Sequence, residues 1–323
     1  MIVSRRVRNN RGAASLSTTA TAVPHSGALT RGGAYGLLAL VVLVWGANWP
    51  SMKVGLHYIS PLWFGCIRMG LGSACLFAYL AATGKLALPT RRDLPVIVSV
   101  GLCQMAIFQP LVNFGLQHVP AGRSSVLVYT TPLWVVPGAM LFLHERLTRL
   151  KLAGLVSGLL GVAVLFNPWA LDWSNGGVVA GSLALMFGAM IWGVAILHIR
   201  GHHWYLSPLQ LTAWQLLLAF LLLLPLATVI DGSAAIQWNG TLIAVILYNG
   251  PLATAFCFWA STSISRALPA MTSSLSFLAV PAMGIALSTL TLGEPLTLTL
   301  LGGFGLILAG VALVNLADWR RSR

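Results

Sequence analysis

Ten long apolar segments, separated by short polar stretches, account for most of this chain. A helix that crosses a bilayer needs roughly 20 mostly apolar residues, and each segment is close to that length. Only 8% of the 323 residues are charged, whereas soluble domains carry about 25%. The sequence therefore predicts an all-α integral membrane protein with ten transmembrane helices, at 34–54, 61–83, 95–117, 122–143, 150–167, 178–198, 208–230, 239–263, 269–290 and 298–317.

The Lys and Arg residues are distributed unevenly between these segments. Of the 19 basic residues, 16 lie before the first span or after the second, fourth, sixth, eighth and tenth. Basic residues collect on the cytoplasmic side, so both termini are predicted to be cytoplasmic. A net charge of +13 could also suggest a nucleic-acid partner. The basic residues do not cluster on one domain, which argues against it.

The two ends of the chain are polar and basic. Residues 1–33 are rich in Arg, Ser and Thr and are predicted to form a disordered cytoplasmic tail. They lack the continuous apolar stretch of a secretory signal, although an organellar transit peptide is an alternative. Residues 318–323 form a basic cytoplasmic C-terminus. We expect a multi-pass protein of the bacterial inner (plasma) membrane.

The chain also repeats itself, which predicts two five-helix units at 34–167 and 178–317. Because five spans is an odd number, the second unit must lie inverted in the membrane. Inverted repeats are common in secondary transporters, which bind substrate near the midplane between the repeats. The matched pairs are Trp45-Gly46 with Trp192-Gly193, SPLWFGCIR at 60–68 with SPLQLTAWQ at 207–215, VPAGRSSVLVYTTP at 119–132 with LPAMTSSLSFLAVP at 268–281, and LHERLT at 143–148 with LGEPLT at 292–297.

These motifs, in this order and duplicated, resemble the drug/metabolite transporter superfamily. The resemblance is carried by WGANWP at 45–50, the spacing of Pro61 and Arg68, and the HERLT and GEPLT segments. It is greatest to EamA-type members with ten helices, and extends to amino-acid exporters of the YddG type. The resemblance implies that the fifth and tenth spans support the bundle, while the other spans surround the substrate.

Polar and aromatic residues at mid-span depth are the candidate substrate contacts. Polar groups are costly in lipid, so they mark functional sites, although hydrogen bonding between helices is an equal alternative for each residue. Gln109 is preferred over Gln104 because the neighbouring Pro110 disturbs the helix. The predicted substrate-binding residues are Trp45, Asn48, Trp49, Gln109, Tyr129, Trp192, Tyr248 and Asn249.

Arg68 and its repeat mate Gln215 form a second group. An arginine inside a span costs at least about 2.5 kcal/mol unless it has a partner. Arg68 could bind a substrate anion, but a structural role is favoured, because the equivalent position also carries a polar donor. Glu145 and Glu294 lie at span ends and are predicted to be structural, with Thr148 and Thr297 as the N-caps of the following helices.

No Asp, Glu or His is predicted at mid-span depth, where proton pumps usually carry a relay residue. The four cysteines lie inside apolar segments without metal-ligand spacing, so we expect no metal and no cofactor.

The sequence predicts an exporter of small metabolites that works by alternating access without proton coupling. The resemblance favours amino acids with apolar or aromatic side chains as substrates. The alternatives are a proton-coupled multidrug or metabolite exporter, or a channel. An intramembrane enzyme is not expected, because neither a Gly-x-Ser-Gly motif with a mid-span His nor a mid-span Asp pair is present. The expected partners are the substrate and the lipid bilayer, and the expected state is a monomer, with a dimer as the alternative.

Overall fold

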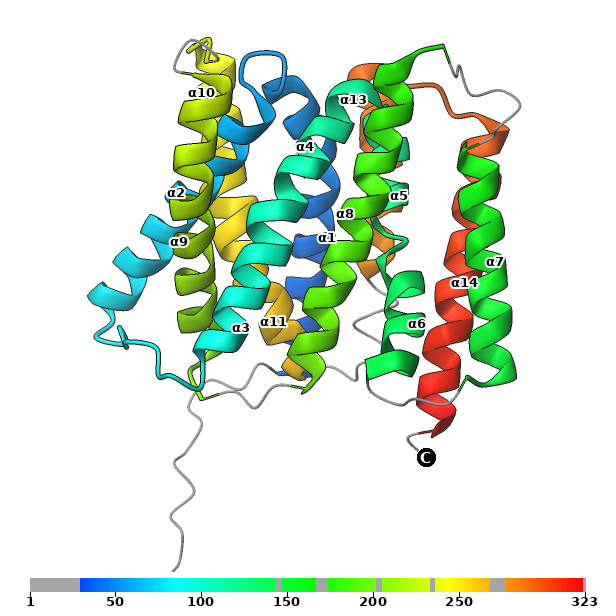
Figure 1. The fold of residues 1–323 in the computed structure, drawn as a ribbon, viewed down its shortest axis with the longest axis horizontal. Helices are drawn as coiled ribbons and strands as arrows, with labels where there is room; N and C mark the ends of the chain where they lie inside the picture. Colours follow the sequence, from blue (N-terminus) through cyan, green and yellow to red (C-terminus); the bar gives the residue numbers. More distant parts are fainter. Residues whose placement is uncertain are drawn as a thin grey trace, which may run out of the picture.

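The computed structural model describes residues 30–142, 147–166, 174–201, 205–232, 236–267 and 277–321, and these segments are almost entirely helical (Figure 1). The elements are α1 Arg31–Gly55, α2 Pro61–Ala82, α3 Leu94–Ser99, η1 Val100–Ile107, α4 Phe108–His118, α5 Ala121–Val128, α6 Thr131–Phe142, α7 Arg149–Phe166, α8 Gly176–Gly201, α9 Pro208–Leu226, η2 Ala227–Asp231, α10 Gly240–Leu247, η4 Tyr248–Phe256, α11 Cys257–Ala267, α13 Ala279–Leu292 and α14 Leu298–Arg321.

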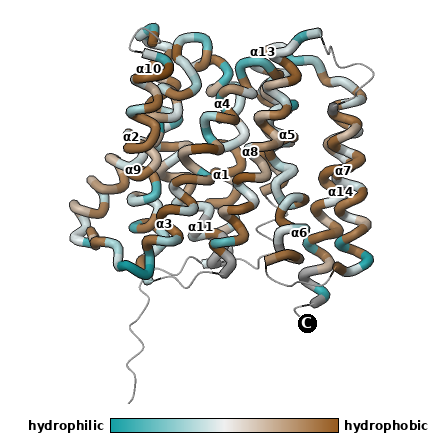
Figure 2. Tube along the Cα trace, viewed as in Figure 1, coloured by the Kyte–Doolittle hydropathy of each residue, from teal (hydrophilic) through white to brown (hydrophobic). Residues whose placement is uncertain are grey.

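Eight helical stretches in the described residues are long and apolar enough to cross a membrane. Figure 2 shows that hydrophilic residues gather mostly at the two ends of these helices. Two of the ten predicted spans are not among the eight. The fifth corresponds to the 18-residue helix α7. The ninth is described only from residue 277 onward, where α13 has 14 residues.

The second and seventh predicted spans, which are repeat mates, pack side by side as α2 and α9. Trp63, near the start of α2, donates its indole N–H to the Gly232 carbonyl beyond the end of α9, at 2.8 Å. Gln210, near the start of α9, donates to the Lys85 carbonyl beyond the end of α2, at 2.6 Å. The two helices therefore run antiparallel. The donors and the acceptors are both equivalent positions of the repeat, as an inverted pair requires.

The fifth and tenth predicted spans, α7 and α14, also run antiparallel and pack closely together through glycines (Figure 1). A Cβ on Gly154 would lie 2.6 Å from the Gly310 carbonyl oxygen, and one on Gly161 would lie 2.7 Å from that of Gly303. Small residues allow helix backbones this close in a bilayer.

Two kinds of helix irregularity shape the interior. The fourth predicted span, 122–143, is one of the eight stretches, at Ala121–Phe142, and a turn at Tyr129 and Thr130 separates its two helices, α5 and α6. Pro132 cannot donate an amide hydrogen bond, and the hydroxyls of Thr130 and Thr131 donate to the carbonyls of Leu127 and Val128 at 2.6 and 2.7 Å. The third and eighth predicted spans instead contain the π-helical stretches η1 and η4.

The predicted N-caps are confirmed. The Thr148 hydroxyl accepts the amide N–H of Lys151 at 3.2 Å, and the Thr297 hydroxyl accepts that of Leu300 at 3.1 Å. Glu145 lies outside the described residues, so its predicted structural role is not observed. Glu294 is described, and its contacts belong to the closed end of the site considered next.

Candidate functional site

A cavity of about 870 Å³ lies between the two halves of the chain. The lining residues come from α1, η1 and the α5–α6 break in the first half of the chain, and mainly from α8, α9 and α11 in the second. Its lining residues are Trp45, Val100, Gln104, Met105, Tyr129, Trp192, Ile199, Tyr205, Leu206, Ser207, Pro208, Thr212, Gln215, Phe258, Ser261 and Phe277.

The cavity continues into a smaller inner pocket of about 70 Å³. The two spaces share Trp45, Gln104, Tyr129, Trp192 and Phe258. The inner pocket alone is lined by Asn48, Trp49, Met52, Arg68, Phe108, Gln109, Val112 and Val128.

The two repeat-equivalent tryptophans, Trp45 and Trp192, stand on opposite halves and line both spaces. The Trp45 indole N–H donates to the Ala253 carbonyl at 2.9 Å, and its ring packs edge-on against Phe258 at 5.9 Å. The Trp192 ring meets Tyr129 edge-on at 6.2 Å. Tyr129 is positioned by the break between α5 and α6. These rings give the cavity large, flat apolar walls.

Arg68 lies in the inner pocket and is only 4% exposed. Its Nε donates to the Thr254 hydroxyl of η4, and its Nη1 donates to the Gln109 amide oxygen at 3.1 Å and to the Met52 sulfur at 3.2 Å. In the described part of the chain, Nη2 has no hydrogen-bond partner, and no carboxylate pairs with the guanidinium. Arg68 thus bridges three elements while its charge remains without a counter-ion.

Three neutral amides add polar groups to the cavity walls. Asn48 is 5% exposed, and its Oδ1 accepts no hydrogen bond from the described residues. Gln104 and Gln215 are also buried and line the main cavity. Among the residues that the structure describes, neither glutamine side chain has a hydrogen-bond partner. Buried polar groups are normally satisfied, so these amides are available to a ligand or to water.

Two of the predicted substrate residues do not line either space. The Tyr248 hydroxyl donates to the Val44 carbonyl at 2.6 Å, and the Asn249 amide donates to the Ser51 hydroxyl at 3.2 Å and the Val245 carbonyl at 2.9 Å. Both side chains therefore join η4 to other parts of the fold instead of facing the cavity. Both residues lie within the π-helical stretch η4, whose side chains do not follow the α-helical period from which their position was predicted.

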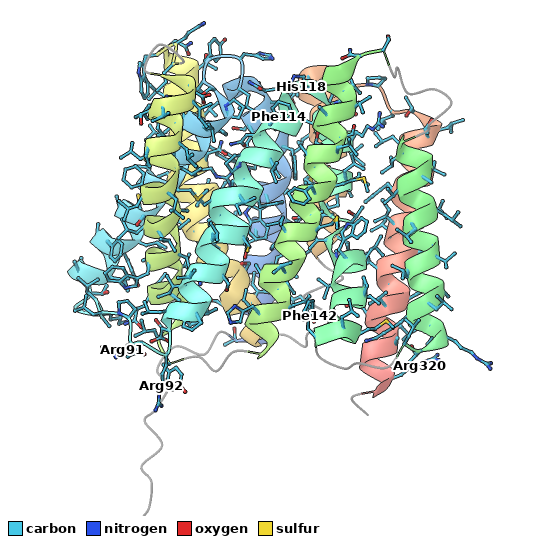
Figure 3. The ribbon with its side chains drawn as sticks, in the orientation of Figure 1. Arg91, Arg92, Phe114, His118, Phe142 and Arg320 are labelled. Atoms are coloured by element: carbon cyan, nitrogen blue, oxygen red, sulfur yellow. The ribbon has the colours of Figure 1, made fainter. Side chains whose placement is uncertain are left out.

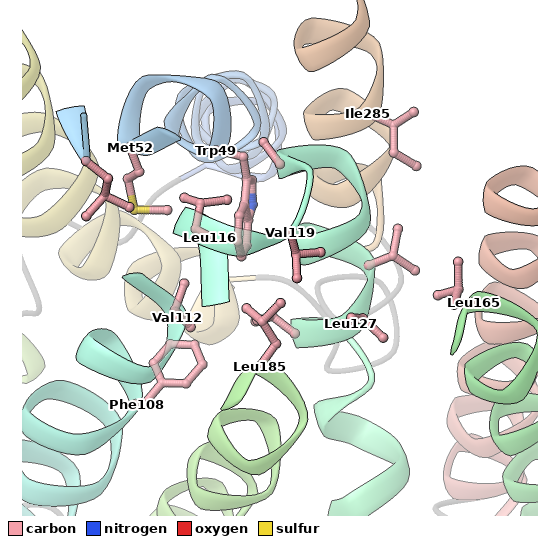
Figure 4. Packing of buried hydrophobic residues seen from close by; sticks show 14 of the residues in the cluster. Trp49, Met52, Phe108, Val112, Leu116, Val119, Leu127, Leu165, Leu185 and Ile285 are labelled. Carbon is pink, nitrogen blue, oxygen red and sulfur yellow. The ribbon is translucent and has the colours of Figure 1, made fainter. Parts of the chain in front are cut away.

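The inner pocket is sealed on one side by a hydrophobic cluster that includes Trp49, Leu116, Val119, Leu127 and Ile285 (Figure 4). We call the end of the bundle beyond this cluster the closed end; it carries Lys53, His118 and Glu294. Figure 3 shows His118 at this end and Arg91, Arg92 and Arg320 at the opposite one.

Two charged side chains hold the closed end together. The Lys53 ammonium donates to the carbonyls of Leu116, Gln117 and Val119, at the end of α4. The Glu294 carboxylate accepts the amide N–H groups of Ala121 and Gly122 at 2.6 and 2.9 Å. A carboxylate at a helix N-terminus and an ammonium at a helix C-terminus both complement the helix dipole. These contacts join α1 and the α13–α14 segment to the junction of α4 and α5.

The main cavity extends to the other end, which we call the open end; it carries Arg91, Arg92 and Arg320, and the first residues of α9 line the cavity there. The buried Asp93 carboxylate accepts the Thr90 hydroxyl at 2.6 Å and the Leu206 amide at 3.3 Å. Burial alone would raise the pKa of Asp93, but the hydrogen bonds from Thr90, Leu206 and Tyr205 outweigh it and lower that pKa.

Among the other cavity residues, Gln104, Thr212, Phe258 and Phe277 were not predicted as substrate contacts. Gln104 was passed over because it lacks a neighbouring proline. The two phenylalanines gave no signal, since aromatic residues are common throughout apolar spans. Thr212 lies one turn before Gln215 on α9, so the helical period starting from Gln215 could have found it.

A helical bundle with antiparallel repeat mates and a central cavity between its halves defines a polytopic membrane transporter. The chain matches the EamA-like transporter family over residues 33–167 and 179–316, once in each half. It belongs to that family, and its two matched regions are duplicated halves.

Several relatives are similar over nearly their whole length. The chain is 28% identical to the transporter YoaV of Bacillus subtilis, over 87% of this chain and 96% of YoaV. It is 30% identical to a probable terminal-alkyne amino-acid exporter of Streptantibioticus cattleyicolor, over 88% and 94%. It is also 30% identical to a probable amino-acid metabolite efflux pump of Salmonella typhimurium, over 89% and 96%.

A solved crystal structure shares the fold. It superposes with a TM-score of 0.60 at 22% identity, covering 91% of this chain and all of the other.

Proposed function

We propose that this protein exports amino acids with apolar or aromatic side chains by alternating access. The observation that carries the proposal is the cavity of about 870 Å³, lined by Trp45 and Trp192 from opposite halves and by neutral amides. Pockets of this size, with apolar walls and few polar groups, suit small organic molecules. The amino-acid exporters among the relatives support this substrate class.

The proposed membrane arrangement has ten spans, with α7 and α13 completing the eight longer helices. The open end faces the cytoplasm of a bacterial cell, because basic residues collect on that side. The cavity is then accessible to cytoplasmic metabolites, as an exporter requires. We propose that the protein acts as a monomer.

Transport is proposed to proceed without proton coupling. Among the described carboxylates, Asp93, Asp231 and Glu294 lie at the ends of spans, and none lines the cavity. A proton-coupled multidrug exporter would need a titratable group that both the proton and the substrate can reach.

Counterflow in liposomes tests the proposal. Purified protein should exchange labelled phenylalanine, leucine or tryptophan saturably, and a protonophore should leave the exchange unchanged. Trp192→Ala should lower the rate at least tenfold, the kinetic equivalent of about 1.4 kcal/mol. Phe187→Ala is the matched control, since Phe187 lies on the same helix and is 52% exposed on the outer surface. Collapse of accumulation by the protonophore would support the proton-coupled alternative, and non-saturable flux would support a channel.

A further inference from the structure

We propose that the inner pocket binds the head group of a zwitterionic amino acid, with Arg68 holding the carboxylate and Asn48 Oδ1 accepting from the ammonium. This inference rests on the proposed function and assigns its selectivity. The side chain of the substrate would extend into the larger cavity between Trp45 and Trp192.

The first argument concerns the charge of Arg68. An ion in the membrane interior is costly unless a counter-charge or several hydrogen bonds compensate it. Thr254, Gln109 and Met52 are all neutral, and they occupy only Nε and Nη1. The guanidinium therefore keeps one donor group and its whole positive charge for a ligand. A planar guanidinium binds carboxylates better than any other side chain.

The second argument concerns Asn48, which lines the same inner pocket. Its Oδ1 is buried and accepts no hydrogen bond from the described residues. A buried acceptor without a donor costs about 1–3 kcal/mol. A ligand that brings an ammonium group would remove that cost. The guanidinium of Arg68 can donate to a carboxylate, and Asn48 Oδ1 can accept from an ammonium. One pocket therefore matches both charged groups of an α-amino acid.

The third argument concerns size. The inner pocket has a volume of about 70 Å³, which admits a head group but not an aromatic side chain. The main cavity, at about 870 Å³, joins it through Trp45, Gln104 and Tyr129. The site would thus be selective for the head group of the substrate and would tolerate different side chains.

The test compares three probes in liposomes: phenylalanine, phenethylamine, which lacks the carboxylate, and hydrocinnamate, which lacks the ammonium. The expected result is that wild-type protein transports phenylalanine at least tenfold faster than either analogue. Asn48→Leu should remove the preference for phenylalanine over hydrocinnamate. Transport of none of the three would refute the proposed function itself. Equal transport of all three would leave the export function standing and overturn the head-group assignment.

Replacing Arg68 directly could unfold the protein, because it bridges three elements. Gln109→Glu avoids this difficulty by placing a carboxylate on the residue that Arg68 already contacts. The new carboxylate should pair with Arg68 and raise the melting temperature, while it competes with the substrate and lowers phenylalanine transport at least tenfold. Gln215→Glu is the matched control: it adds the same charge to the main cavity, at the position equivalent to Arg68, and should lower phenylalanine transport less.

If Arg68 has only a structural role, these variants should give a different result. Gln109→Glu would then raise the melting temperature with transport unchanged, which would overturn the proposal. A second readout is the rise in melting temperature that phenylalanine causes. It should be present in the wild type and in Gln215→Glu but lost in Gln109→Glu, and its retention in Gln109→Glu would also overturn the proposal.

Discussion

The closed end and the open end contain equivalent turns of the two repeats, but different contacts hold these turns in place. At the closed end, the turn between α1 and α2 pairs through its backbone: the Gln237 amide donates to the Tyr58 carbonyl at 2.7 Å, beside a bridge between Ile59 and Ile236. At the open end, the segment before α9 contains the equivalent residue Tyr205. It is held by side chains, with the Arg92 guanidinium 5.4 Å from the Tyr205 ring centroid.

This difference indicates how one fold can present its cavity to one side. At the closed end, Lys53, Glu294 and the backbone pair act on helix termini beside a filled hydrophobic cluster. At the open end, the cavity occupies the space that a corresponding cluster would fill. Alternating access requires that the two ends exchange these roles, so the contacts at the closed end must be strong enough to seal it and weak enough to break.

The largest expected effect is a contrast in accessibility between equivalent positions. Thr212 lines the open cavity, and its repeat mate Gly65 is buried where a Cβ meets only ordinary contacts, the nearest at 3.5 Å. In a chain whose four cysteines are replaced by alanine, Thr212→Cys should react with a membrane-impermeant maleimide on the order of 100-fold faster than Gly65→Cys. That ratio corresponds to an opening free energy of about 2.8 kcal/mol.

Thr212→Cys is labelled in inside-out vesicles, where the reagent reaches the cytoplasmic side, and Gly65→Cys is labelled in right-side-out vesicles, where it reaches the periplasmic side. Equal labelling rates would show that the two ends are equally open, and the comparison would fail. Fast labelling of Thr212→Cys from the periplasmic side alone would reverse the proposed orientation.

Removing the Glu294 carboxylate should loosen the closed end. Glu294→Ala leaves the buried amides of Ala121 and Gly122 without their acceptor, at a cost of about 1–3 kcal/mol. Labelling of Gly65→Cys should then rise about tenfold, the equivalent of about 1.4 kcal/mol. Thr297→Ala is the control, since it removes a cap from α14 without touching α5. The same rise in the control would show that Glu294 acts through general stability.

Lys53→Met should have a smaller effect in the same direction. Methionine keeps the apolar stem but loses the ammonium that caps the end of α4, and a cation at a helix C-terminus stabilises by about 0.3–1 kcal/mol. Labelling of Gly65→Cys should rise a few-fold. Lys85→Met removes an exposed charge near the open end and should leave that rate unchanged. If Lys53→Met also leaves it unchanged, the ammonium does not contribute to the seal.

Much of this arrangement could be predicted from the sequence. Apolar length predicts the helices, and the duplicated motifs predict the antiparallel mates α2 and α9. Trp45, Asn48, Gln109, Tyr129 and Trp192 lie around the inner pocket because α-helical spans keep their period up to the points where prolines disturb them.

The remainder depends on tertiary packing that a single sequence does not encode locally. Asn249 lines neither space, because η4 changes the phase of its side chains. The contact of Glu294 with Ala121 joins residues 173 positions apart, and no motif indicates which helix terminus a span-end carboxylate will reach. The functional reading of Arg68 became stronger for the same reason, since only the fold shows that its partners are neutral.

The smallest expected effect concerns Asp93 at the open end, and it depends on pH. Hydrogen bonds lower the pKa of Asp93 in the folded state, so the carboxylate stabilises the fold at any pH above its unfolded pKa of about 3.9. This stabilisation is lost as the pH falls through the lowered folded-state pKa. Asp93→Asn should cost about 1–2 kcal/mol at neutral pH. Its deficit against wild type should shrink as the pH is lowered from about 5 to about 3, measured by thermal unfolding in detergent. Thr90→Ala removes one donor to the carboxylate, so its stability should lie between those of the wild type and Asp93→Asn. A deficit that stays constant with pH would show that Asp93 acts through packing alone, and that its charge does not help to hold the open end.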